Sequence, residues 1–130
     1  MRSFLVFLFI LLAFGVSGAF AQGGGKAEPN RINIAAGKSS ATLAGRLSND
    51  QEMEYFFGAK KGQRVTIRNT RTGLFDFRVF SEEFDFDTEF ESSPVLVFVI
   101  PETGDYNFIV RKKRVRAPRS ARFSLTLTIK

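Results

Sequence analysis

The sequence of 130 residues contains no cysteine, no histidine and no tryptophan. Without cysteine the chain can form neither a disulfide nor a thiolate metal site. Without histidine it lacks the side chain that most often serves as a general base or a metal ligand. The usual nucleophile–base arrangements of hydrolases are therefore excluded. We expect a protein that is not an enzyme and that carries no cofactor.

Acidic residues are fewer than basic ones, with 13 Asp and Glu against 19 Lys and Arg and a formal net charge of +6. A basic protein can approach nucleic acid, an anionic membrane or an acidic protein cleft, and composition alone does not choose among them. Phenylalanine is abundant, with 16 residues. A chain of this length is one domain and can build a sufficient core without disulfides.

The N-terminal apolar run is too short to cross a membrane. It covers residues 4–14, follows Arg2, and is followed by small residues that include Ala19 and Ala21. A membrane-spanning helix needs about 20 apolar residues, whereas this order is typical of a secretory signal peptide. We expect residues 1–21 to form a helical signal peptide that is cleaved after Ala21. Residues 22–30 are then a flexible glycine-rich lead-in to a domain at 31–130, with no stable membrane insertion after cleavage.

Apolar and polar residues alternate with a period of two in most of the remaining chain, clearest at 123–129, where apolar side chains alternate with Ser and Thr. Such alternation is typical of half-buried antiparallel strands. We expect strands at 31–34, 41–47, 53–57, 64–68, 76–80, 95–100, 106–111 and 123–129. The segment 95–100 is apolar at every position, which predicts burial on both faces or a place near the centre of a sheet. The pattern favours an all-β, antiparallel, two-sheet sandwich of about eight strands and jelly-roll-like type.

A basic stretch at residues 111–122 joins the last two predicted strands and contains seven cations and no acid. Pro118 lacks a backbone donor, so strand pairing should be interrupted there and a protruding loop should follow. Such a loop can be a solvated hairpin tip, but its arginines offer planar forks that match carboxylate or phosphate. We favour a binding role. Nucleic acid is disfavoured as the partner, because no aromatic residues are interleaved for base stacking.

An acidic stretch at residues 82–91 places Asp85, Asp87 and Glu89 on one face of an extended segment and phenylalanines on the other. A calcium site is one interpretation, but the glycine turn and ligand order of an EF-hand are missing. We favour a polar face whose phenylalanines pack inward, with no metal bound. This stretch could also partly neutralise the basic loop.

Several motifs resemble the bacterial periplasmic inhibitors of g-type lysozyme. They are Gly37–Ala41 followed by Gly45, then Tyr55–Val65, then Ile100–Tyr106, and the closing strand that ends at Lys130. The similarity covers almost the whole chain after the leader. The Ala-Lys-Lys-Gly-Gln turn and the Pro-x-x-Gly-x-Tyr corner also recur in pre-peptidase C-terminal domains, which share a jelly-roll-like sandwich. Full length as one secreted domain favours the inhibitor.

The resemblance implies a periplasmic sandwich whose loops at one end plug the substrate cleft of g-type lysozyme, its partner. The family tyrosine before the Tyr55 strand falls on Asp50, a departure that bears on affinity or target choice. Of the two family arginines before the last strand, the first falls on Arg114 and the second on Arg116 or Arg119. We expect the protein to be a monomer or a weak homodimer.

An alternative function is an envelope-binding module whose basic loop docks on anionic lipid, lipopolysaccharide or cell-wall polymer. Its binding would fall steeply with salt. Arg→Lys changes separate the two hypotheses, because lysine cannot reproduce the guanidinium fork that cleft insertion needs but keeps the charge that surface attraction needs.

Overall fold

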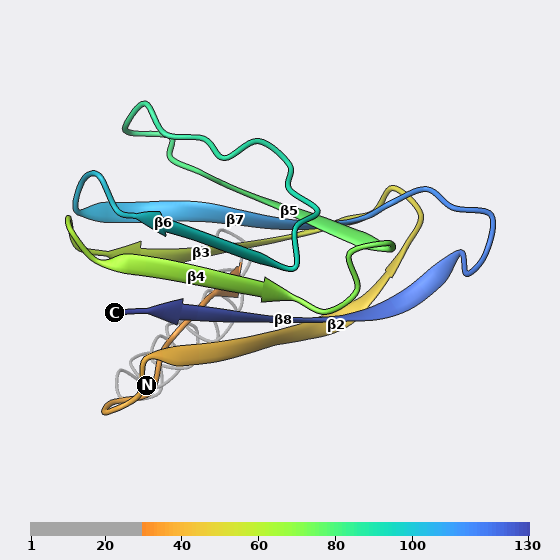
Figure 1. Cartoon of the computed structure of the whole chain (residues 1–130), viewed down its shortest axis with the longest axis horizontal. Helices are drawn as coiled ribbons and strands as arrows, with labels where there is room; N and C mark the ends of the chain where they lie inside the picture. The colour runs from red at the N-terminus through yellow and green to blue at the C-terminus, as the bar shows by residue number, and fades with distance from the viewer. Residues whose placement is uncertain (1–29) are drawn as a thin grey trace, which may run out of the picture.

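The computed structural model describes residues 30–130; the predicted signal peptide and all but the last residue of the predicted lead-in lie outside these residues. Eight strands form two sheets packed over a common core (Figure 1). The strands are β1 (Asn30–Arg31), β2 (Ser40–Ser48), β3 (Glu52–Ala59), β4 (Arg64–Asn69), β5 (Phe75–Phe80), β6 (Val95–Val99), β7 (Gly104–Lys112) and β8 (Ser120–Ile129). The predicted all-β sandwich is confirmed. No helix within 30–130 has the length and apolarity that a membrane crossing requires.

The two sheets contain four strands each. Sheet A has the order β1-β3-β7-β5 and sheet B the order β2-β8-β4-β6. β8 lies inside sheet B, where it pairs along nine residues with β2, from Ser40 opposite Thr128 to Ser48 opposite Ser120. The pairings are antiparallel except that of β1, which runs parallel to β3. Because of this one parallel pairing, the sandwich is mostly rather than wholly antiparallel. The strand predicted at 31–34 is shorter than expected and ends at Arg31.

The core follows from the period-two pattern. Along β8 the side chains of Phe123, Leu125 and Leu127 are buried and the residues between them face outward. Aromatic rings fill much of the space between the sheets, including Phe57 stacked on Tyr106 with ring centroids 5.8 Å apart. Large aromatic side chains bury enough apolar area to stabilise a domain that has no disulfide.

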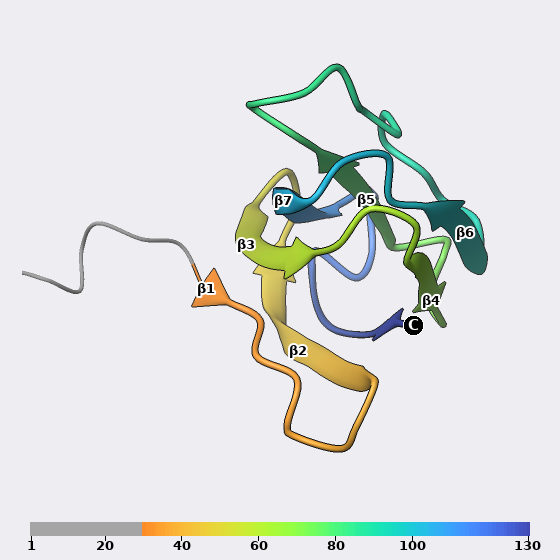
Figure 2. The same ribbon diagram turned by 90° about the vertical axis from the view of Figure 1, so that its left-hand side faces the viewer.

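The position of β6 corrects one sequence-based prediction. β6 is an edge strand of sheet B, as Figure 2 shows in the view from the end, and Val95, Val97 and Val99 on its outer face are 39%, 49% and 54% exposed. The alternate residues Leu96 and Phe98 pack against the core. The unbroken apolar run predicts burial on both faces or a place near the centre of a sheet, but valine is also favoured in strands for its shape, and one face of this edge strand meets solvent.

The acidic stretch runs back along the free edge of β5. Isolated bridges join Phe77 to Glu91 and Phe80 to Asp87. The side chains of Phe84 and Phe86 pack on the core, whereas Asp85, Asp87 and Glu89 are exposed. The predicted polar face is therefore confirmed with Phe84 and Phe86 inward, whereas Phe90 stacks against the guanidinium of Arg111 instead of entering the core.

The carboxylates of this stretch do not neutralise the basic loop. Its tip lies at the opposite end of the sandwich from the loop between β7 and β8 (Figure 1). Arg78 donates hydrogen bonds of 2.9 and 2.6 Å to Asp87, which hold the pKa of the Asp87 carboxyl below its ordinary value. Within residues 30–130 no cluster of three acidic side chains is arranged to hold a metal ion.

Candidate functional site

The loop at residues 113–119 joins β7 to β8 and lies beside the turn at 49–51, which joins β2 to β3. The two connections meet because β2 pairs with β8 while β3 pairs with β7. Backbone hydrogen bonds link them: the N–H of Asn49 donates to the carbonyl of Arg119 at 2.9 Å, and the N–H of Asp50 to that of Lys112 at 3.0 Å. β8 begins at Ser120, after Pro118, so the predicted interruption of strand pairing is confirmed.

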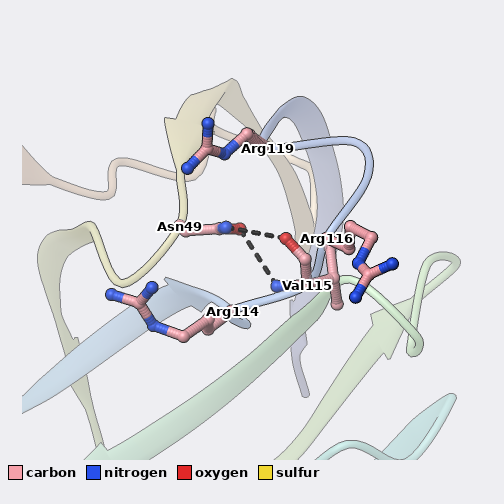
Figure 3. Close-up of a pocket in the computed structure, with 5 residues that line it drawn as sticks. All are labelled: Asn49, Arg114, Val115, Arg116 and Arg119. Carbon is pink, nitrogen blue, oxygen red and sulfur yellow. Dashed lines mark hydrogen bonds between the residues drawn. The ribbon is translucent and has the colours of Figure 1, made fainter.

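The side chain of Asn49 anchors the middle of this loop (Figure 3). Its Nδ2 donates to the carbonyl of Val115 at 2.8 Å, and its Oδ1 accepts from the N–H of Val115 at 3.2 Å. The same Oδ1 accepts from Lys112 Nζ at 2.8 Å. One amide therefore satisfies both backbone groups of Val115 in a loop that has no strand partner.

Three of the seven cations in the basic stretch have side chains bonded within the domain and are not displayed for a partner. Lys112 is fully buried, and its Nζ donates to Asn49 Oδ1 and to the carbonyl of Lys113 at 2.9 Å. Lys113 Nζ donates to the carbonyl of Thr72 at 2.8 Å. Arg111 forms an ion pair of 2.8 Å with Asp76. The protruding cationic segment is thus shorter than the sequence suggested.

Of the four cations that remain, Arg122 lies in β8. The other three, Arg114, Arg116 and Arg119, are exposed and line an open hollow of about 350 Å³ together with Asn49 and Val115. Figure 3 shows the guanidinium groups of Arg114 and Arg119 on the same side of Val115, below and above Asn49, whereas that of Arg116 extends to the other side of Val115. The predicted site residues are therefore gathered at one end of the sandwich, but the arginines do not all face the same way.

Asp50, in the turn between β2 and β3, lies at the same end of the sandwich and forms an ion pair with Arg114. It occupies a left-handed backbone conformation with φ of 68°, which aspartate tolerates better than most residues. Its carboxylate pairs with the guanidinium of Arg114, with the two side chains 53% and 74% exposed. An ion pair this open to water contributes about 0–1 kcal/mol, so another carboxylate can replace Asp50 at low cost. Within residues 30–130 no acidic side chain pairs with Arg116 or Arg119.

Sequence reasoning missed Asn49 and Lys112. Asn49 was visible as a turn residue, but its bonds reach residues 63 and 66 positions away along the chain. Lys112 was counted among the loop cations, because a lysine in a basic run gives no sign that its side chain points inward. The site that results offers guanidinium donors on a firmly held loop, which suits the binding of carboxylate or phosphate groups.

Solved structures with a similar architecture include inhibitors of lysozyme. PliG of Aeromonas hydrophila, a periplasmic inhibitor of g-type lysozyme, superposes with a TM-score of 0.64 at 23% identity over 78% of this chain and 95% of that chain. A mutant of the Escherichia coli inhibitor PliG-Ec gives 0.62 at 25% identity over 77% and 96%. This chain has the PliG fold. No protein-family model and no curated protein sequence matches it.

The PliG fold also extends to a more distant relative in shape. The pre-peptidase C-terminal domain of a Bacillus anthracis collagenase superposes with a TM-score of 0.51 at 17% identity, over 79% of this chain and 95% of that domain. The two resemblances noted in the sequence are therefore both confirmed as likenesses of fold. The two PliG structures are those of lysozyme inhibitors.

Proposed function

We propose that this protein is a periplasmic inhibitor of g-type lysozyme that inserts loop arginines into the substrate cleft of the enzyme. The observation that carries the proposal is the pair Arg114 and Arg119, displayed on one side of a loop that Asn49 anchors to a sandwich of the PliG fold. A flexible loop would lose conformational entropy on binding, and an anchored loop loses less.

The second inserted arginine is Arg119 in this proposal, not Arg116. Two guanidinium groups can enter one cleft together only if they extend in the same direction. Arg114 and Arg119 do so, whereas Arg116 extends away from them (Figure 3). Arg119 is also bonded through its own carbonyl to the N–H of Asn49, which limits the movement of its backbone.

The chemistry of a lysozyme cleft supports this arrangement. Glycoside hydrolases of this kind use carboxyl groups flanking the scissile bond. An arginine that donates to such a carboxylate in a cleft from which water is displaced gains about 1.5–3 kcal/mol for each charge-assisted hydrogen bond. Arg114 first exchanges Asp50 for the carboxylate of the enzyme, while Arg119 binds without such an exchange.

The direct test is a lysis assay with protein purified from the periplasm of an expressing bacterium. We expect stoichiometric inhibition of g-type lysozyme and no inhibition of other lysozyme types. Undiminished lysis by g-type lysozyme at a large molar excess of the protein would contradict the proposal.

Variants of the loop then test which arginines act. Arg119→Lys and Arg119→Gln should each weaken inhibition by about tenfold or more, because lysine lacks the planar fork and glutamine the charge. Arg116→Gln is the matched control from the same loop, with an expected change below about threefold. Equal losses at both positions would show that the loop acts only through its total charge.

A further inference from the structure

The two outer faces of the sandwich differ in how their charges are paired. Each arginine in the strands of sheet A has an acidic partner. The pairs are Arg31–Asp105 at 2.9 Å, Arg78–Asp87 at 2.6 Å and Arg111–Asp76 at 2.8 Å. The arginines of these strands are therefore neutralised within the molecule, and the exposed carboxylates of Glu52 and Glu54 in β3 leave this face with no free positive charge for an anionic partner.

Sheet B has the opposite character. Its four strands contain no Asp or Glu, and four exposed arginines alternate with buried residues and so face outward: Arg46, Arg64, Arg68 and Arg122. Within residues 30–130 none of the four forms an ion pair, and the side chain of Arg46 donates a long hydrogen bond of 3.4 Å to the hydroxyl of Ser120. Four unpaired cations on one face repel one another unless an anionic partner covers them.

Exposed valines lie directly beside two of these arginines. In the β4–β6 register Val95 is opposite Arg68 and Val99 is opposite Arg64, with Val97 between them. These are the only large hydrophobic side chains with high exposure among residues 30–130. Hydroxyl residues of β4 and β8, such as Thr66 and Thr128, occupy the neighbouring outward positions. The face thus combines cations, hydroxyls and an apolar edge.

We propose that the outer face of sheet B docks on an anionic phospholipid surface. The arginines bind lipid phosphates and the three valines of β6 enter the headgroup region. A soluble polyanion would satisfy the arginines but leave the valines in water, and a second copy facing this sheet would bring four unpaired arginines against four others. A lipid surface supplies phosphates for the arginines and an apolar layer for the valines.

This inference goes beyond lysozyme inhibition and uses a different surface. The loop at residues 113–119, the arginine loop, lies at one end of the sandwich, whereas the outer face of sheet B runs along its length (Figure 1). Docking through sheet B therefore holds the inhibitor at a membrane and leaves the loop open to its partner.

Sedimentation with vesicles tests the proposal, using protein purified from the periplasm. Vesicles of phosphatidylcholine with about one third phosphatidylglycerol should bind the protein, and phosphatidylcholine alone should not. The double variant Arg64→Gln, Arg68→Gln should lower binding by about 25-fold, which is about fivefold for each charge. Val97→Ser should lower it by about threefold through the loss of apolar contact.

The loop double variant Arg116→Gln, Arg119→Gln is the matched control, with vesicle binding within about twofold of the parent. Lysozyme inhibition provides the reciprocal readout, because the Arg64, Arg68 variant should inhibit as well as the parent does. The two proposals can therefore fail separately.

Three results would overturn membrane docking. The first is loss of vesicle binding in the loop variant but not in the sheet variant, which would assign lipid binding to the loop. The second is retention on immobilised heparin without vesicle binding, which would indicate a soluble polyanion as the partner. The third is a dimer in gel filtration that Val97→Ser dissociates, again without vesicle binding, which would assign the β6 edge to a second copy of the chain.

Discussion

A single amide side chain, that of Asn49, holds the arginine loop at its midpoint. It bonds both backbone groups of Val115 and the buried ammonium of Lys112. Within residues 30–130 every buried side-chain nitrogen and oxygen has a hydrogen-bond partner, and Lys112 Nζ has two acceptors, Asn49 Oδ1 and the carbonyl of Lys113. Removal of the amide leaves a fully buried cation short of one acceptor.

Asn49→Ala should therefore lower the free energy of unfolding by about 1–3 kcal/mol, because buried groups lose their partners. Urea denaturation measures this change. Asn107→Ala is the control, since Asn107 makes an exposed hydrogen bond of 3.3 Å to Glu54 and its loss should cost less than about 0.5 kcal/mol. Equal effects of the two substitutions would contradict the anchoring role of Asn49.

Asp50 stands where the resemblance places a tyrosine, and its carboxylate occupies Arg114. Asp50→Asn keeps a residue that tolerates the left-handed backbone but removes the charge that competes for the guanidinium. We expect g-type lysozyme inhibition to strengthen by about two- to fivefold, the range that an exposed ion pair can account for. Inhibition constants of the two proteins measure the change, and weaker inhibition by the asparagine variant would show that Asp50 itself contacts the enzyme.

At the scale of the strands, Gly45 of β2 is placed against the core. A Cβ at this position would lie 3.0 Å from the ring of Phe123, which is itself packed edge-on against Phe75. Gly45→Ala should therefore destabilise the domain by about 1–3 kcal/mol through overpacking, seen as a lower midpoint of thermal unfolding. Ala44→Ser, on the exposed face of the same strand, is the matched control. An unchanged midpoint in the alanine variant would mean that the Phe123 ring moves freely.

The strands themselves were largely predictable, because a sheet with one buried face imposes a period of two on residues such as Phe123, Leu125 and Leu127. The strand at 95–100 was predicted, but its place at the edge of sheet B was not. An apolar run reflects both β-propensity and burial, and the sequence alone does not separate the two. Which strands pair with one another could not be predicted from the sequence. The contact between Asn49 and Val115 depends on the alignment of β2 with β8 and of β3 with β7, which no local pattern encodes.

The candidate site was predicted in part for the same reason. The spacing of the cations identified the loop and its proline, but the direction of each side chain depends on tertiary contacts. Lys112 turns inward to Asn49, and Arg114 meets Asp50 across the end of the sandwich. One partner in each contact comes from the turn between β2 and β3, more than 60 positions away in the sequence.

For the whole molecule, the segregation of charge predicts two different responses to salt. Raising sodium chloride from about 0.1 to about 1 M shortens the Debye length from about 10 to about 3 Å, which screens exposed charges far more than buried ones. Vesicle binding through sheet B should fall more than tenfold, while the dissociation constant for lysozyme should change by less than about tenfold. Vesicle sedimentation and calorimetry measure the two. A parallel loss of both would indicate that one cationic surface serves both partners.

The position of β8 inside sheet B has a consequence for folding during synthesis. β8 is the inner neighbour of both β2 and β4, so β2 cannot join β4 and β6 in sheet B before β8 has been synthesised. Until then sheet B is incomplete and the nascent chain cannot fold fully. For a chain exported unfolded, as the predicted leader implies, a sheet that only β8 completes delays folding until that strand has been synthesised.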